Sequence, residues 1–307
     1  MKIRREALLG FAIGGLLATS AQAQSFSYAS FADTAGLQLN GAAAAANIGG
    51  RDLLRLTPPQ ANTGGSVFST QAITLADHYS FSTRFTFNIG SNNVNQYGEI
   101  GADGIAFVIQ PLSNNVGGLG GAMGYGGISP SLEVEFDTYS NGGSDPRLPG
   151  NGALNGNDHV AIMLNGDYTY HLAYSIVSPT LELNGGQDIT AFVDYDSVAQ
   201  LLQVRWSTDG QRPDQAGLSY GIDLASVFGA DPVYVGFTAS TGADWSEQDI
   251  VNWAFNDTYD PISTAPTDGP SNEVPEPSSW LLVIAGIGGA AWAMRRQRRQ
   301  CLRGAIG

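Results

Sequence analysis

Apolar and polar residues alternate along much of the middle of this chain. In the segment 81–89, phenylalanine or isoleucine occupies positions 81, 85, 87 and 89, whereas positions 82, 84, 86 and 88 are polar. Successive side chains of a strand point to opposite faces, so this pattern predicts a half-buried β-strand. Similar reasoning predicts strands at 104–109, 132–139, 159–164, 168–175, 187–195, 201–207 and 233–239.

Turn signals separate these predicted strands. Asn165–Asp167 and Thr208–Gly210 are typical of hairpin turns, and the one helical pattern is short, at 223–228. Glycine accounts for 40 of the 307 residues, which favours turns and closely packed backbones over helices. Many short strands with such turns predict an all-β fold, an antiparallel β-sandwich.

The N-terminal segment 1–23 has the three parts of a secretory signal peptide. Three basic residues within the first five precede the apolar stretch Leu8–Leu17, and Ala21–Ala23 has the small-x-small pattern of a cleavage site. The apolar stretch is too short to cross about 30 Å of hydrocarbon, which favours a cleaved signal over a membrane anchor.

The C-terminal segment 274–300 combines a Pro-Glu-Pro motif, the apolar stretch Trp280–Met294 and the basic run Arg295–Arg299. This order resembles the PEP-CTERM sorting signal of Gram-negative bacteria. The resemblance implies transient anchoring in the inner membrane, processing by an exosortase, and release to the cell surface or an extracellular matrix. A plain C-terminal anchor stays an alternative. A spacer rich in Pro, Ser and Thr at 260–273 leaves one domain, 24–259.

Composition and charge exclude several classes of protein. The formal net charge is −14, and most of the 14 basic residues lie at the two ends, so the body is strongly acidic and we expect no nucleic-acid partner. Hydrophobic residues make up 43% of the chain, which is enough for a core. The single cysteine, Cys301, excludes an intrachain disulfide framework and a cysteine-based zinc site.

The strand predicted at 132–139 carries the residues with the most chemistry. Glu133, Glu135 and Asp137 share one face at a spacing of about 6–7 Å, where their charges repel one another. Such a row is tolerated if it is well solvated or if a cation lies among the carboxylates. Asn141, Asp145, Asp158 and His159 follow downstream. Oxygen ligands suit calcium, and a histidine beside carboxylates suits a transition metal such as manganese, so we predict a metal site.

Four segments in order carry a resemblance to the legume (L-type) lectins. In chain order they are Ala102–Phe107, Gly120–Gly124, the metal loop (Val134–Asn141, Asp145–Pro146 and His159–Ile162) and Tyr234–Gly242. The resemblance covers about residues 26–258 and implies a concanavalin-like jelly roll.

The resemblance also implies roles for individual residues. Glu135, Asp137 and His159 would hold Mn²⁺ or another transition metal, with Asp145 shared, and Asp137 would bridge to Ca²⁺. The calcium would also take the Tyr139 carbonyl, Asn141 and Asp145. In the sugar pocket, Asp103, after a cis Ala102–Asp103 peptide, would accept hydrogen bonds from two sugar hydroxyls. Asn141 and the Gly121 N–H would donate, the Tyr139 ring would stack on the sugar, and Ala243 and Asp244 would form the variable wall.

Two departures from the family pattern concern the metals. Asp145 and His159 are farther apart than in the family, and 148–156 has the character of an insertion. Both metals could still bind, Asp158 could replace Asp145, or calcium alone could bind. The family's late histidine is also missing, since the chain has Gln248 in that region.

These features predict a secreted, calcium-dependent lectin that binds a glycan, with exopolysaccharide as a candidate, and that is not an enzyme. A glycoside hydrolase on the same sandwich is an alternative, because laminarinase-like enzymes carry alternating carboxylates on one strand. A non-binding structural protein of the matrix is another. Family members often pair edge strands, so a homodimer stays open.

Overall fold

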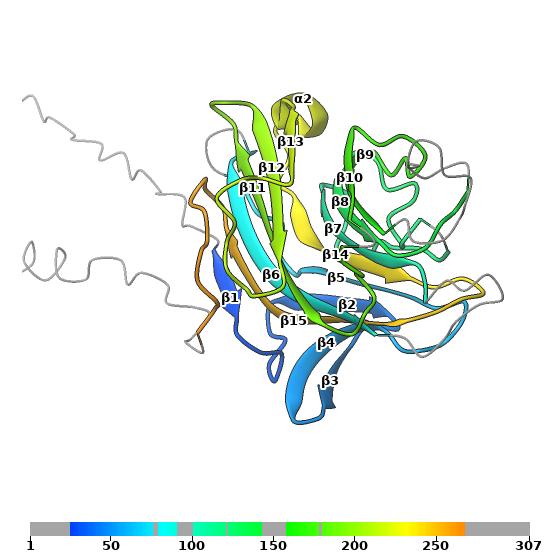
Figure 1. Ribbon diagram of the computed structural model, residues 1–307. Coiled ribbons are helices and arrows are strands. Elements are labelled where there is room, and N and C mark those ends of the chain that lie inside the picture. The colour runs from blue at the N-terminus through cyan, green and yellow to red at the C-terminus, as the bar shows by residue number, and fades with distance from the viewer. Residues whose placement is uncertain are drawn as a thin grey trace, which may run out of the picture.

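The computed structural model describes residues 25–75, 79–90, 101–120, 122–142, 158–177 and 180–267. These residues form two antiparallel sheets that pack face to face, with eight strands in one and seven in the other (Figure 1). The predicted all-β antiparallel sandwich is therefore confirmed.

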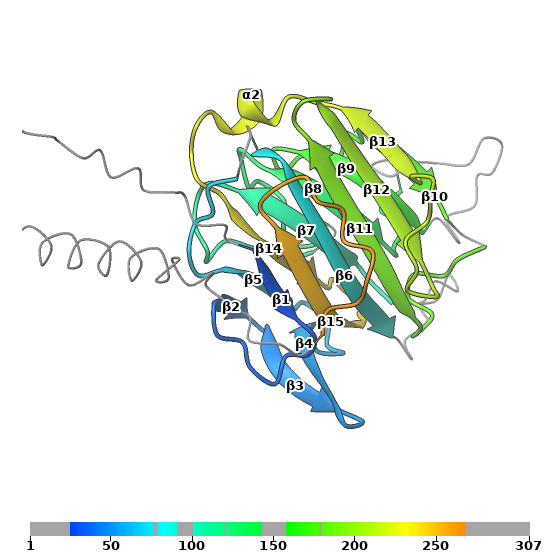
Figure 2. The same ribbon diagram turned by 90° about the vertical axis from the view of Figure 1, so that its left-hand side faces the viewer.

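The larger sheet contains β1 (Phe26–Tyr28), β3 (Ala44–Ile48), β4 (Arg51–Thr57), β6 (Phe81–Gly90), β11 (Asp188–Asp196), β12 (Leu201–Ser207), β13 (Leu218–Gly221) and β15 (Glu247–Asn256). Its order is β13-β12-β11-β6-β15-β4-β3, and β1 pairs with β15. Figure 2 shows this sheet facing the viewer. The alanine run at its edge, β3, pairs with β4.

The smaller sheet contains β2 (Leu37–Gly41), β5 (Gly64–Ser69), β7 (Gly104–Gln110), β8 (Leu132–Asp137), β9 (His159–Leu164), β10 (Ala173–Ile176) and β14 (Tyr234–Ser240). Its order is β10-β9-β8-β7-β14-β5-β2. The short helix α2 (Leu224–Phe228) begins after Asp223, whose side chain accepts a hydrogen bond from the Ala225 N–H. A carboxylate is a favoured N-cap, which explains why the predicted helical segment starts there.

The core between the sheets is built largely from phenylalanines. The Phe85 ring on β6 lies 4.8 Å from the Phe237 ring and 5.8 Å from the Phe136 ring, centroid to centroid. Leu132 and Val134 of β8 point into the same core, as the alternation predicts. Burying side chains of this size contributes about 1.5–3 kcal/mol each, so this core is the main stabilising element of the fold.

The outward face of the smaller sheet is covered as well. Met123, Tyr125 and Ile128, from the connection between β7 and β8, pack on residues of β5, β7 and β9 in a second apolar cluster. As a result the acidic row of β8 is buried, with Glu133, Glu135 and Asp137 exposed by 0%, 1% and 3%. The alternative of a solvated acidic face is therefore wrong.

The strand predicted at 168–175 is the clearest difference from the expected elements. The regular strand β10 begins only at Ala173, and 165–172 form turns. Asn165 and Gly166 have positive φ angles, and the Asp167 carboxylate accepts hydrogen bonds from the Thr169 N–H and hydroxyl. Such local hydrogen bonds compete with strand pairing, and His171 follows in the same connection, where it contacts Glu135.

Two predicted segments lie outside the described residues, namely the signal peptide at 1–23 and the apolar stretch at 280–294. Within the ranges that the structure describes, no helix is long and apolar enough to cross a membrane.

Candidate metal centre and carbohydrate site

Strands β8 and β9 place the predicted transition-metal ligands on one face. Asp137 at the end of β8 is directly opposite His159 at the start of β9, and Glu135 is opposite Ala161. Directly paired residues of neighbouring strands point to the same face, so His159 lies beside Asp137 and diagonally from Glu135. The strand register thus brings together residues that are 24 positions apart.

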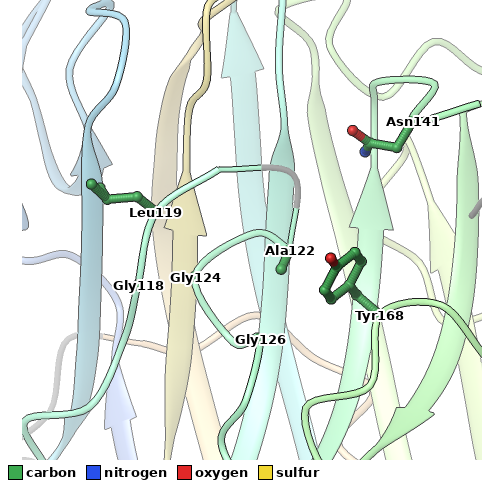
Figure 3. A pocket seen from close by; sticks show the side chains of 7 residues that line it. All are labelled: Gly118, Leu119, Ala122, Gly124, Gly126, Asn141 and Tyr168. Atoms are coloured by element: carbon green, nitrogen blue, oxygen red, sulfur yellow. The ribbon is translucent and has the colours of Figure 1, made fainter.

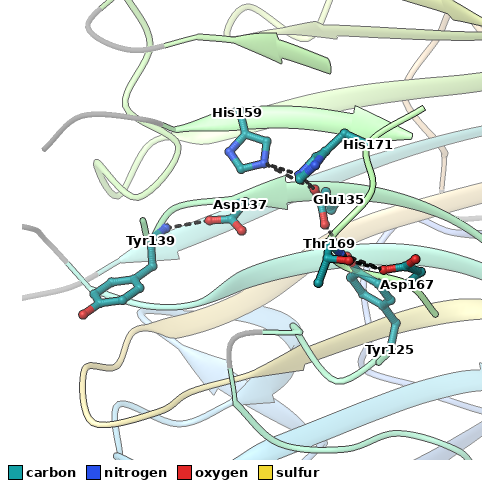
Figure 4. A network of polar contacts seen from close by, with 8 residues as sticks. All are labelled: Tyr125, Glu135, Asp137, Tyr139, His159, Asp167, Thr169 and His171. Atoms are coloured by element: carbon teal, nitrogen blue, oxygen red, sulfur yellow. Dashed lines mark hydrogen bonds and ion pairs between the residues drawn. The ribbon is translucent and has the colours of Figure 1, made fainter. Parts of the chain in front are cut away.

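Three side chains converge at this point, and one of them was not predicted. Glu135 Oε1 lies 3.3 Å from His159 Nε2 and 3.1 Å from His171 Nε2, and the two Nε2 atoms are 3.3 Å apart (Figure 4). One ligand atom from each residue lies within 4.8 Å of the other two, which is the spacing of a metal site. Nitrogen and carboxylate donors together suit a transition metal.

Glu135 is held as an ionised carboxylate. Burial raises its pKa, but hydrogen bonds from His159 and His171 outweigh this and bring the pKa to about 2. The Tyr125 hydroxyl donates to its other oxygen, Oε2. Burial, together with the nearby charge of Glu135, raises the pKa of Tyr125 well above its usual value, so Tyr125 stays a donor. The carboxylate therefore keeps Oε1 directed at the two histidines.

The remaining predicted metal ligands are placed in part. Asp137 is not one of the three clustered residues, and its Oδ1 accepts a hydrogen bond of 2.7 Å from the Tyr139 N–H. Asn141 lies farther along the same loop, and Asp145 is outside the described residues. The Asp158 carboxylate accepts a 2.6 Å hydrogen bond from the Leu183 N–H, which does not favour its use in place of Asp145.

The predicted sugar-binding aspartate lies next to the metal loop. The Ala102–Asp103 peptide is cis, as expected. The Thr138 N–H donates to the Asp103 carbonyl at 3.0 Å, and the Asp103 N–H donates to the Ser240 carbonyl at 3.0 Å. Gly104 follows with a φ of 135°, and a side chain there would meet the Phe136 carbonyl oxygen at 2.3 Å. Only glycine allows this close approach to β8.

A cavity of about 480 Å³ opens beside this loop (Figure 3). It is lined by Gly118, Leu119, Ala122, Gly124, Gly126, Asn141 and Tyr168. Gly121, whose N–H we expected to donate to the sugar, is outside the described residues, but its neighbour Ala122 lines the cavity.

The predicted variable wall follows β14. A Cβ on Gly242, the residue before Ala243 and Asp244, would lie 4.0 Å from Asp103 Oδ2. Ala243 is exposed and Asp244 is partly buried. Of the predicted sugar-binding residues, the structure places Asn141 in the lining of the cavity.

Comparison with known proteins identifies the family. Residues 23–270 match the legume lectin domain. The chain belongs to the legume lectin domain family. Residues 273–299 match the PEP-CTERM protein-sorting motif, which confirms the second resemblance and implies export and sorting to the cell surface.

Three relatives with lectin domains match different shares of this chain. The L-type lectin-domain containing receptor kinase IX.2 of Arabidopsis thaliana is 31% identical over 198 residues, which are 59% of this chain and 26% of the kinase. The lectin of Pisum sativum is 26% identical over 220 residues, 67% of this chain and 74% of that lectin. The structure of the Bauhinia forficata lectin in complex with GalNAc has a TM-score of 0.61 and 26% identity, covering 79% of this chain and 99% of that one. The chain thus spans about a quarter of the receptor kinases it matches.

Family membership decides between binding and catalysis. Legume lectins are carbohydrate-binding proteins without catalytic activity, which confirms the prediction that the chain is not an enzyme. The geometry agrees, because Glu133, needed by the hydrolase alternative, is fully buried. Burial raises its pKa to about 8, despite hydrogen bonds from Ser131 and the Gly166 N–H. A protonated carboxyl suits a general acid, but no substrate reaches one at this depth.

Four residues in or beside the candidate site were not predicted from the sequence. His171 and Tyr125 contact Glu135, Tyr168 lines the cavity with 42% of its surface exposed, and Gln248 donates to the Ala102 and Ser240 carbonyls. Of these four, His171 carried a sequence signal. It is one of the three histidines of the chain, and it follows the predicted ligand His159 by 12 positions.

Proposed function

We propose that this chain is a secreted lectin that binds a glycan through Asp103 and Asn141 in a pocket organised by bound calcium. The main support is the 3.0 Å hydrogen bond from the Thr138 N–H to the Asp103 carbonyl. It joins the residue that accepts sugar hydroxyls to the loop that carries Asp137 and Tyr139. Any ion that orders this loop therefore also positions Asp103.

The proposed metal ligands follow from the chemistry of the loop. Asp137, the Tyr139 carbonyl, Asn141 and Asp145 are oxygen donors, the type that calcium prefers, and calcium would supply a rigid framework for the loop. Glu135, Asp137, Asp145 and His159 are the proposed donors to a transition metal. Ligand atoms of Glu135, His159 and His171 lie within 4.8 Å of one another and combine carboxylate with nitrogen donors, which supports a transition metal at this place.

The proposed sugar contacts include Asn141, which lines the cavity. Asp103 accepts from two sugar hydroxyls, and the Asn141 side chain and the Gly121 N–H donate to the same sugar. The Tyr139 ring lies against the apolar face of the sugar, and Ala243 with Asp244 tunes selectivity. The GalNAc bound in the Bauhinia forficata lectin supplies a first probe, N-acetylgalactosamine.

We also propose where this binding takes place. The signal peptide at 1–23 directs secretion across the inner membrane, where 280–294 anchors the chain transiently. An exosortase then processes the sorting signal, and the lectin domain reaches the cell surface or the extracellular matrix. There an exopolysaccharide is a glycan within reach.

A glycan array with the full-length chain tests the proposal. We expect binding in calcium, loss of binding in EDTA, and recovery when calcium is added back. Asp103→Asn should weaken binding by about 10–100-fold, because hydrogen bonds to a charged group contribute about 1.5–3 kcal/mol. The matched control is Asp214→Asn, a change of the same charge at an exposed position far along the chain.

Two results would contradict the proposal. A chain that captures no glycan from the array or from the producer's exopolysaccharide would favour the structural matrix protein. Binding that is unchanged by EDTA and by Asp103→Asn would place recognition outside this pocket.

A further inference from the structure

The triangle formed by Glu135 Oε1, His159 Nε2 and His171 Nε2 has sides of 3.3, 3.1 and 3.3 Å. Four ligands around a tetrahedral ion, with bonds of about 2.0–2.1 Å, lie about 3.3–3.4 Å from one another. The triangle therefore has the dimensions of one face of the coordination shell of a transition-metal ion. His171 contributes a corner that the family resemblance did not include.

Hydrogen bonds alone do not satisfy all three sides of this triangle. Each imidazole Nε2 carries either one proton or one lone pair, and the Glu135 carboxylate only accepts. If both histidines donate to Glu135, two N–H groups face each other. If one histidine donates to the other, a nitrogen lone pair faces the carboxylate. A cation at the centre receives all three lone pairs and removes the conflict.

The surroundings hold these three groups in a ligand geometry. Tyr125 donates to the second oxygen of Glu135, which is the type of contact that orients metal ligands. The His171 ring stands nearly perpendicular to the Tyr174 ring, with centroids 6.1 Å apart. Glu135 and His159 are almost fully buried, whereas the His171 side chain is 9% exposed, so His171 is the most exposed of the three groups.

We propose that His171 is a direct metal ligand and that the Glu135–His159–His171 face makes this centre selective for Zn²⁺ over Mn²⁺ and Ca²⁺. Two imidazoles and one carboxylate are a recurrent ligand set for zinc with an open fourth position. Nitrogen donors also favour zinc over manganese in the order of divalent-ion affinities, and they are poor ligands for calcium. The inference rests on the metal centre of the proposed function and not on its glycan specificity.

Calorimetric titration of the full-length chain tests this selectivity after removal of metals by chelation and dialysis. ZnCl₂, MnCl₂ and CaCl₂ are titrated separately, and elemental analysis after dialysis gives the stoichiometry. We expect one zinc per chain at this centre, bound at least about tenfold more tightly than manganese.

The variant His171→Gln removes the proposed ligand. Loss of an outer contact typically weakens metal binding 10–100-fold, so loss of a direct ligand should weaken zinc binding by at least about 100-fold. Tyr174→Phe is the matched control, because it keeps the ring beside His171 and should leave zinc affinity unchanged. His171→Cys supplies another zinc ligand and should retain zinc while binding manganese poorly.

Circular dichroism establishes that each variant is folded, and Co²⁺ provides a second readout. The visible absorption of the Co²⁺-loaded chain reports its coordination, and it should change in His171→Gln but not in Tyr174→Phe. Equal zinc affinity in the wild type and His171→Gln, or equal affinity for zinc and manganese in the wild type, would overturn the inference. Zinc binding without glycan capture would refute the proposed function alone, and calcium-dependent glycan capture with no zinc site would refute only this inference.

Discussion

Gln248 on β15 is expected to support glycan binding without touching the glycan. It is fully buried, and its Nε2 donates to the Ala102 carbonyl at 3.2 Å and to the Ser240 carbonyl at 3.0 Å. The Asp103 N–H donates to the same Ser240 carbonyl. Gln248 therefore ties together the two segments that position Asp103, and Gln248→Met removes both donated hydrogen bonds at nearly constant volume.

The magnitude follows from the groups left behind. The buried Ala102 carbonyl loses Gln248 as a donor, and an unsatisfied buried acceptor costs about 1–3 kcal/mol. Ser240 keeps the hydrogen bond from Asp103, and the Gln248 Oε1, which has no partner among the described residues, is removed at a gain. We expect the free energy of unfolding to fall by about 1–2 kcal/mol. If Asp103 shifts with its loop, the glycan dissociation constant should rise about tenfold.

Gln110→Met is the matched control for this change. Gln110 is also fully buried, but it lies at the other end of β7, where its side-chain bonds to described residues all go to the turn at Leu112 and Ser113. Urea denaturation and glycan calorimetry are measured on both variants. We expect similar losses of stability, with weaker glycan binding only in Gln248→Met. Unchanged glycan affinity in Gln248→Met, despite its lower stability, would show that Gln248 does not position Asp103.

Three further predictions concern stability and metal affinity. Phe85→Ala should lower the free energy of unfolding by about 3–5 kcal/mol in urea denaturation, because it leaves a cavity among packed aromatic rings. A loss below about 1 kcal/mol would contradict this account of the core. Arg212→Met should cost about 1–3 kcal/mol by the same measurement, because among the described residues it leaves the buried Asp194 carboxylate with Arg205 alone as an ion-pair partner. The double change with Asp194→Leu should recover part of that loss, and no recovery would argue against the ion pair. The metal affinity of the full-length chain should be lower at pH 5 than at pH 7, because protons compete with the metal for its imidazole ligands, and a metal titration at each pH measures the difference; an affinity that does not change with pH would argue against histidine ligation.

Local patterns were sufficient to predict most of the strands and the direction of their side chains. The alternation in 81–89 and 132–139 correctly gave β6 and β8 and the inward-facing phenylalanines, because a strand repeats every two residues whatever it packs against. The same rule put Glu133, Glu135 and Asp137 on one face. The strand at 168–175 was predicted wrongly, because the Asp167–Thr169 hydrogen bonds compete with strand pairing and no periodicity reveals them.

Tertiary structure alone decided what covers that acidic face and which side chains meet on it. Burial beneath Tyr125 removes the row of carboxylates from solvent, and this burial depends on the path of the connection between β7 and β8. The position of His171 over Glu135 depends on the turn between β9 and β10, and the support of Gln248 under Ala102 joins residues 146 positions apart. A repeat of two residues describes only neighbours along one strand. Contacts between distant segments are selected by the packing free energy of the whole sandwich, so they exist only once the chain has folded.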